Sequence, residues 1–217
     1  DLVDVIDLSC YEEGREYHIL GYYIDIDNKI LKNYLEEFRR ARLIRAEKII
    51  KKLRSLNVPL TFEEILEQAG EAPVARPHIA MVMLEKGYTS SFKEAFLSYL
   101  GEGRPAYESK MQFPVSQAIK LIKECNGISI LAHPARSVSQ EMLYQFIELG
   151  IDGVEVVHPM HDKDMQKYYH DIAAQYWLIE TGGSDFHGTR DFDEPNFGKF
   201  TVPCSVVDSL RTRAGRR

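Results

Sequence analysis

The C-terminal half of the chain contains two apolar runs that end in the same dipeptide, Ile128-Ser-Ile-Leu-Ala-His133-Pro and Val154-Glu-Val-Val-His158-Pro. Each run has the length and the β-branched composition of a buried strand. A helical pattern at Glu141–Leu149 lies between them. Because strands about 25 residues apart with intervening helices are typical of βαβ units, this stretch predicts a parallel sheet.

The pattern extends in both directions from this stretch. We expect a helix at Gln117–Cys125, another at Asp162–Tyr176 and a strand at Trp177–Glu180. Residues 1–28 are rich in aromatic and β-branched residues, with a Glu12-Glu13-Gly14 turn that predicts a hairpin. Residues 29 to about 105 are predicted to be helical. The simplest architecture is a β/α barrel interrupted by a helical insertion.

Helix signals in the insertion support this division. A long amphipathic helix is expected to end near Asn57 and Pro59, and Thr61-Phe-Glu-Glu64 has the pattern of a capping box. Ser91-Phe-Lys-Glu94 repeats that pattern. Pro77 suits the first turn of a further helix, where its missing N–H is not needed.

Composition narrows the classes of protein. The chain has 217 residues, 44% of them apolar and 28% charged, as in an ordinary globular protein. Neither a signal peptide nor a membrane-spanning stretch is apparent. Three widely separated cysteines make a disulfide framework unfavourable and fit a reducing compartment. We therefore expect a cytoplasmic protein without a membrane partner.

The net charge of −6 conceals an asymmetry. Residues 29–54 contain ten Lys or Arg and three Glu, a local balance of +7, so the rest of the chain carries −13. A basic helix on an acidic protein could attract a polyanionic substrate. A charge run of this kind is also typical of a helix face that is merely solvated.

Four polar residues are expected at the ends of the predicted parallel strands: His133, His158, Asp185 and His187. In β/α barrels these ends share one mouth, where the chemistry collects. Imidazole and carboxylate groups are suitable ligands for Zn, Mn or Fe ions. The alternative, separate hydrogen-bonded histidines, explains one residue well but explains the set of four poorly.

Other candidates are weaker when taken alone. Arg76 and His78 open a predicted helix, where an arginine and free backbone N–H groups can bind an anion. Arg136 could bind phosphate in a bidentate manner beside His133, although either arginine could equally be a surface residue. His18 alone fits a core histidine. We expect His161 and His170 to face solvent and assign them no role; nucleophilic-serine and phosphate-loop motifs are absent from the sequence.

Five motifs in order resemble the PHP (polymerase and histidinol phosphatase) superfamily of metal-dependent phosphoesterases. They are Tyr17-His-Ile-Leu-Gly-Tyr22, Ala75-Arg-Pro-His-Ile79, Leu131-Ala-His-Pro134, Val154-Glu-Val-Val-His-Pro159 and Gly182-Gly-Ser-Asp-Phe-His187. The branch with a helical insertion, which includes nucleoside 3′,5′-bisphosphate phosphatases and 5′-to-3′ exoribonucleases, is the most similar. The resemblance implies an α/β fold, a distorted (β/α)7-type barrel of residues 1–28 and 111–217, with a helical subdomain at 29–110.

The resemblance also implies roles for the candidate residues. Two or three divalent ions (Mn, Zn, Fe or Mg) would be bound by a set of five metal ligands, and four residues would contact substrate. The implied ligands are Asp7, His18, His133, Asp185 and His187; the implied substrate contacts are Arg76, His78, Arg136 and His158. His133, Asp185 and His187 are in addition the expected catalytic residues.

The family's initial His-x-His and Thr-Asp-His segments are not present in this sequence, which contains no histidine before His18. We therefore expect the whole protein to have further N-terminal segments. The expected activity is hydrolysis of phosphate esters of nucleotides or short RNA ends, with no obligate protein partner. Two alternatives stay open: a different metal-dependent hydrolase, such as an amidohydrolase, and an inactive relative that binds phosphate or nucleic acid.

Overall fold

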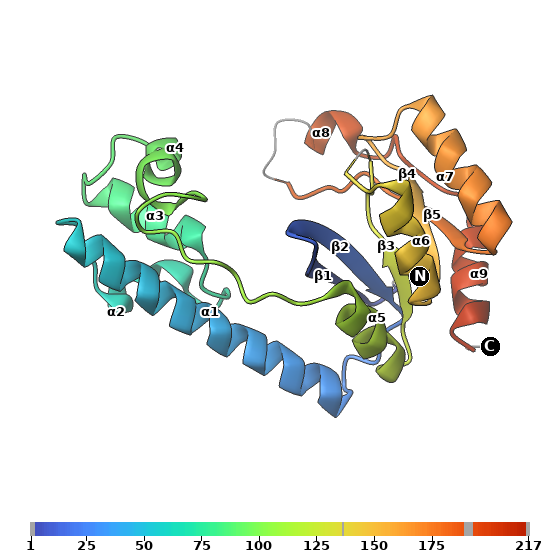
Figure 1. Ribbon diagram of the computed structural model, residues 1–217, viewed down its shortest axis with the longest axis horizontal. Helices are drawn as coiled ribbons and strands as arrows, with labels where there is room; N and C mark the ends of the chain where they lie inside the picture. The colour runs from blue at the N-terminus through green and yellow to red at the C-terminus, as the bar shows by residue number, and fades with distance from the viewer. Residues whose placement is uncertain (1–2, 136, 189–192, 216–217) are drawn as a thin grey trace. The chain divides into compact units, whose positions relative to one another are not determined.

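The computed structural model describes residues 3–135, 137–188 and 193–215 of the chain. The chain forms two compact units (Figure 1). Unit 1 comprises Asp1–Leu31 and Gln112–Arg217, and unit 2 comprises Lys32–Met111. No helix among the described residues combines the length and the apolar character needed to cross a membrane.

The described part of unit 1 is built on a mixed sheet of five strands in the order β1-β2-β3-β4-β5. Their bounds are β1 Val5–Glu12, β2 Arg15–Tyr22, β3 Ile128–Leu131, β4 Gly153–Val157 and β5 Ile179–Gly182. The hairpin β1–β2 turns at Glu13 and Gly14, both with positive φ. β2 pairs with β3 antiparallel, whereas β3, β4 and β5 are parallel. The sequence thus predicted the hairpin and the parallel strands correctly.

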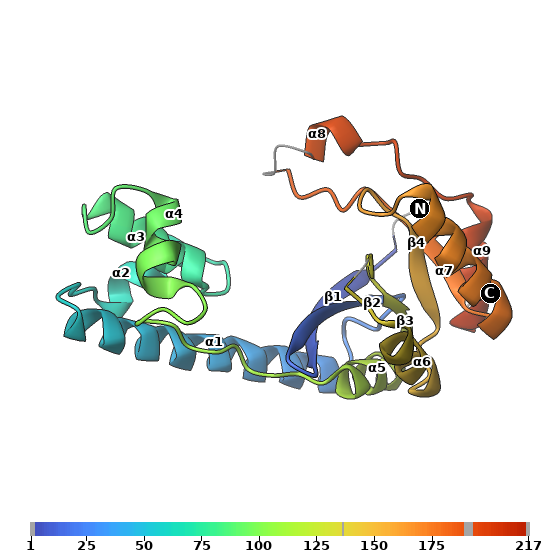
Figure 2. The same ribbon diagram turned by 45° about the horizontal axis from the view of Figure 1, so that its top comes forward.

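Helices cover this sheet. The helices of this unit after the hairpin are α5 Val115–Glu124, α6 Gln140–Glu148, α7 Lys163–Tyr176, α8 Asp193–Asn196 and α9 Ser205–Arg213. α5 packs against β1, β2 and β3, whereas α7 packs against β4 and β5, and α9 against β5 (Figure 2). All four residues of β3 are buried. Parallel strands covered by helices are expected to be this apolar, because no strand face reaches solvent.

One sequence-based expectation is confirmed in part, and another needs correction. The described strands form the expected mixed α/β sheet, which is open among these residues; closure into a barrel depends on pairing between distant strands, which local patterns do not specify. The predicted strand at Trp177–Glu180 begins only at Ile179. Trp177 instead ends α7 in the left-handed conformation, with φ 52° and ψ 37°, and is exposed.

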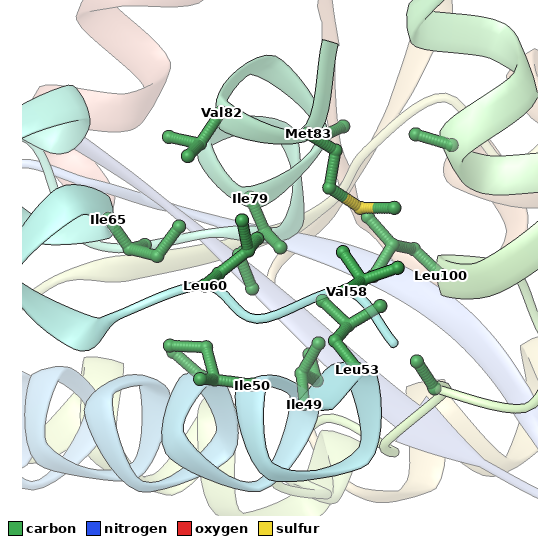
Figure 3. Close-up of a cluster of buried hydrophobic side chains, with 14 of the residues drawn as sticks. Ile49, Ile50, Leu53, Val58, Leu60, Ile65, Ile79, Val82, Met83 and Leu100 are labelled. Carbon is green, nitrogen blue, oxygen red and sulfur yellow. The ribbon is translucent and has the colours of Figure 1, made fainter. Parts of the chain in front are cut away.

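Unit 2 is helical. Its elements are α1 Lys29–Ser55, whose first residues belong to unit 1, α2 Phe62–Ala69, α3 Arg76–Glu85, α4 Phe92–Ala95 and the π-helical turn η1 Phe96–Leu100. Figure 3 shows apolar side chains of α1, α2 and α3 around a common core, among them Leu53, Ile65 and Ile79. Thr61 and Glu64 form the predicted capping box, and the Ser91 hydroxyl caps α4 by accepting from the Glu94 N–H.

Candidate metal and phosphate site

His133 is the centre of a group of polar side chains at one edge of the sheet in unit 1. It follows β3 by two residues, with a backbone φ of 27°. β2 runs antiparallel to β3, and the Ala132 N–H donates to the His18 carbonyl at 3.0 Å. The His18 and His133 rings are consequently adjacent, with centroids 5.1 Å apart. The pairing of β2 with β3 therefore brings together two residues separated by more than a hundred positions.

The next two parallel strands contribute His158 and Asp185. The His158 ring is buried, with its centroid 5.2 Å from that of His133. Its Nε2 lies 4.0 Å from Oδ2 of Asp185. Asp185 follows β5 by three residues and has φ 51°. Left-handed backbone at a residue other than glycine is strained, and such strain collects at functional sites. His133 and Asp185 both have this property.

Hydrogen bonds indicate which ring nitrogens can act as ligands. Nδ1 of His18 lies 3.1 Å from Oδ2 of Asp7, and Nδ1 of His187 lies 2.7 Å from the carbonyl of Asp185. Both partners are acceptors, so Nδ1 carries a proton in each ring, and in the neutral form of each ring Nε2 has the lone pair. A histidine that donates its other N–H to an oxygen has the usual arrangement of a metal ligand.

His158 has the opposite tautomer. Its Nδ1 accepts from the Met160 N–H at 3.1 Å, so in the neutral ring the proton is on Nε2, which faces Asp185. A protonated Nε2 donates hydrogen bonds and does not ligate metal. This geometry is compatible with the expected substrate contact of His158 and separates it from the expected ligands.

Glu155 is a residue of this group that sequence reasoning missed. It is buried on β4, and its Oε2 accepts from the His133 N–H at 2.7 Å. Burial, opposed by the hydrogen bond from the His133 N–H and assisted by the carboxylates of Asp185 and Asp7, raises the pKa of Glu155 to about 7. The sequence feature that could have indicated Glu155 is its position as a single acidic residue inside the apolar run Val154-Glu-Val-Val. A charged side chain buried in such a strand needs a partner or a functional role.

Two further buried residues support the loops of the site. The Asp193 side chain accepts from the His187 N–H at 3.2 Å. His161 was expected to face solvent, and that expectation is wrong: it is buried, its Nδ1 donates to the Val156 carbonyl at 2.8 Å, and its Nε2 accepts from the Ala135 N–H at 3.0 Å. Both ring nitrogens are used, so His161 holds the loop after His133. His170 is exposed, as predicted.

The imidazole and carboxylate side chains of this group are of the kinds that bind divalent metals, but they approach one another only in pairs. Among residues 3–135, 137–188 and 193–215, no group of three His, Cys, Asp or Glu side chains is close enough to hold a metal ion. Burial and the neighbouring His18 lower the pKa of His133, which keeps that ring neutral. Neutral imidazoles and carboxylates fit Mn, Zn or Fe. A cavity of about 600 Å³ lies against His18 and His133.

The candidate phosphate-binding residues are divided between the two units. Arg76 and His78 lie in the first turn of α3 in unit 2. Nδ1 of His78 accepts from the Ala75 N–H at 3.1 Å, which leaves the proton on Nε2. The Arg76 guanidinium donates to the Leu100 carbonyl at 3.0 Å and lies over the rings of Phe96 and Tyr107. Arg136 lies outside the described residues.

The chain resembles characterised phosphoesterases. It is 30% identical over 192 residues to the 5′-3′ exoribonuclease Rnm of Escherichia coli, an alignment that covers 86% of this chain and 66% of that protein. It is 26% identical to the 3′,5′-nucleoside bisphosphate phosphatase of Chromobacterium violaceum, covering 86% and 69%. The chain thus spans slightly less than two thirds of the exoribonuclease. No family model matches it.

Solved structures agree. A protein of Bifidobacterium adolescentis, provisionally described as a metal-dependent phosphoesterase, is 27% identical with a TM-score of 0.78, over 97% of this chain and 76% of that one. An amidohydrolase of Chromobacterium violaceum, solved with sulfate and no metal, is 23% identical with a TM-score of 0.72, over the same shares, and shows the fold alone. These homologues confirm the resemblance found in the ordered motifs and are consistent with the PHP superfamily.

Proposed function

We propose that this homologue of the PHP-type phosphoesterases hydrolyses phosphate esters of nucleotides or of the 5′ ends of short RNA, with metal-activated water. The main support is the convergence of His18, His133, His158 and Asp185 at one edge of the sheet. The names of the homologous exoribonuclease and bisphosphate phosphatase support the same substrate class. The distorted seven-stranded barrel of residues 1–28 and 111–217, with its insertion at 29–110, belongs to this proposal.

The residues proposed to hold two or three ions of Mn, Zn, Fe or Mg are Asp7, His18, His133, Asp185 and His187. Bound divalent ions would lower the pKa of water from 15.7 to about 7 and neutralise charge on the phosphoryl oxygens. His18 and His187 present Nε2 as a lone-pair donor, because Nδ1 is held by an acceptor in each ring. Asp7 orients His18 through that hydrogen bond.

The remaining polar residues would act on the substrate. His158 holds a proton on Nε2 and is suited to donate a hydrogen bond from it to a phosphoryl or leaving oxygen. Arg76, His78 and Arg136 would bind phosphate oxygens, since both guanidinium groups and the protonated Nε2 of His78 are hydrogen-bond donors. Glu155 positions the backbone of His133 and thereby the ring.

Phosphate release from a nucleoside 3′,5′-bisphosphate with Mn²⁺ tests this proposal. We expect His133→Ala to lower kcat/KM by at least about 100-fold, since even the hydrogen-bonding partners of metal ligands have effects of about 10- to 100-fold. His170→Ala is the matched control, because His170 is an exposed histidine of α7 that pairs with Glu180. Equal rates in wild type and His133→Ala would defeat the proposed site. Activity on a cyclic amide alone would favour an amidohydrolase, and less than one metal per chain an inactive binding relative.

A further inference from the structure

We propose that unit 2 contains a second contact for RNA, a groove along α1 that binds single-stranded RNA and thereby favours longer substrates. This basic groove is defined by Phe38, Arg42, Arg45, Lys48, Arg76 and Lys110. The inference rests on the proposed function, whose residues are mainly in unit 1. The groove would make kcat/KM depend on the length of the RNA substrate, which the catalytic residues alone would not do.

The groove consists of two hollows of about 220 and 270 Å³ that share four lining residues, Ala41, Arg45, Lys110 and Met111. The first hollow is lined by four cationic side chains, those of Arg42, Arg45, Arg76 and Lys110, and its described lining contains no acid. Lys48 and Glu108 line the second, where Oε1 of Glu108 lies 3.0 Å from Nζ of Lys52. The groove therefore has a strong excess of positive charge, which attracts a polyanion.

Arg42 is the residue of this groove that most needs a ligand. Its Nε is buried and has no hydrogen-bond partner among the described residues. Burial also lowers the pKa of Arg42 below its ordinary value. A partly desolvated guanidinium without a counter-charge is costly, and an oxygen of a bound phosphate would offset that cost. By contrast, Arg45 already donates from Nε and a terminal nitrogen to the Glu108 carbonyl at 2.9 and 2.7 Å.

Aromatic rings next to these cations favour a single-stranded nucleic acid over another polyanion. The Arg42 guanidinium lies 4.8 Å from the centroid of the Phe38 ring. Tyr34, one helical turn earlier, stacks on Phe38 with centroids 6.1 Å apart. Both rings are half-buried. Cations that follow a backbone beside aromatic rings that stack bases are the usual means of binding single strands. An acidic peptide would use the charges but not the rings.

The test compares two substrates in the full-length protein with Mn²⁺: a nucleoside 3′,5′-bisphosphate, and a 5′-phosphorylated oligoribonucleotide of about ten nucleotides, within the usual span of single-strand sites. The groove variant is Arg42→Gln/Lys48→Gln. The control is Arg40→Gln/Lys51→Gln, which removes the same charge from exposed positions of α1 that line neither hollow. The quantity compared is the kcat/KM for the oligoribonucleotide divided by that for the bisphosphate.

We expect this ratio to fall about tenfold in the groove variant and to stay within about twofold in the control. Binding of the labelled oligoribonucleotide to metal-free protein, by fluorescence anisotropy, should weaken similarly, and its salt dependence should lose a slope of about 0.7 per cation removed. Lys48→Gln alone, at an exposed position that does not perturb folding, should show part of the effect. An unchanged ratio, an equal fall in the control, or equally tight binding of polyglutamate would overturn the inference.

Failure of the proposed function would give a different result. A wild-type protein that releases no phosphate from either substrate contradicts the phosphoesterase, whereas the anisotropy measurement still decides on the groove. In that event, weaker RNA binding by the groove variant than by the control supports the groove, and equal binding of RNA by the two variants rejects it.

Discussion

The edge of the sheet in unit 1 and the helical core of unit 2 differ in the kinds of side chain that they bury. The unit 2 core consists of buried apolar side chains, among them Leu53, Ile65 and Ile79, and its helices α2 and α4 begin with side-chain caps. At the sheet edge, Glu155 and His158 are buried polar residues, with left-handed backbone at positions beside them. One region follows the local rules of stability and the other breaks them.

This difference shows which region of the fold contains locally destabilising features. Burying Glu155 or placing His133 at a positive φ costs free energy, and the fold must supply that energy elsewhere. Departures from local rules are expected mainly at functional sites. The contrast therefore supports the sheet edge as the reactive region, independently of the resemblance to phosphoesterases. The comparison also makes predictions that can be measured without a substrate.

The largest effect on stability is expected in the unit 2 core. Leu53→Ala removes a side chain with no exposed area, and the loss of burial plus the remaining cavity should lower the free energy of unfolding by about 2–5 kcal/mol. Leu97→Ala is the control, because that side chain is 54% exposed and should change stability by less than about 0.5 kcal/mol. Urea unfolding measures both. Similar losses in the two variants would show that unit 2 lacks the close-packed core described here.

Sequence patterns predicted the regular parts of both regions. The capping box at Thr61 and the strand positions of His133 and His158 depend on local composition and on the shared edge of parallel strands, and all were found. The burial of Glu155 and His161 could not be predicted in this way. Whether a polar side chain beside a strand points inward depends on elements distant in sequence, such as the loop whose Ala135 N–H bonds to His161.

Replacement of alanine by glycine should change the free energy of unfolding in opposite directions in the two regions, by about 1 kcal/mol or less in each. Ala135 has φ 43° in the loop after His133, so Ala135→Gly should relieve strain and raise the free energy of unfolding by about 0.5 kcal/mol. Ala80 lies buried within α3, so Ala80→Gly should lower it by about 1 kcal/mol. Thermal or urea unfolding gives both values. A loss of stability in Ala135→Gly would mean that the loop is not strained.

The smallest effect concerns an exposed ion pair between α7 and β5 in unit 1. Nδ1 of His170 lies 3.0 Å from Oε1 of Glu180, and the hydrogen bond and charge of Glu180 raise the pKa of His170 above its ordinary 6.5. A raised folded-state pKa means that the pair stabilises the fold fully below the unfolded pKa, and that this contribution disappears as pH rises through the folded pKa.

His170→Gln should therefore destabilise the protein slightly at about pH 5.5 and not at about pH 8.5, measured by urea unfolding. Lys167→Gln is the control from the same helix, since Lys167 pairs with Asp171 at 2.8 Å and the pair shifts the pKa of Lys167 up and that of Asp171 down. Both groups of that pair stay charged across this range, so its effect should change with pH much less than that of His170→Gln, through only the weak repulsion between Lys167 and the His170 imidazolium. A His170→Gln effect that is equal at both, or larger at high pH, would contradict the assigned ion pair, because only loss of the imidazolium charge can make the contribution decline with rising pH.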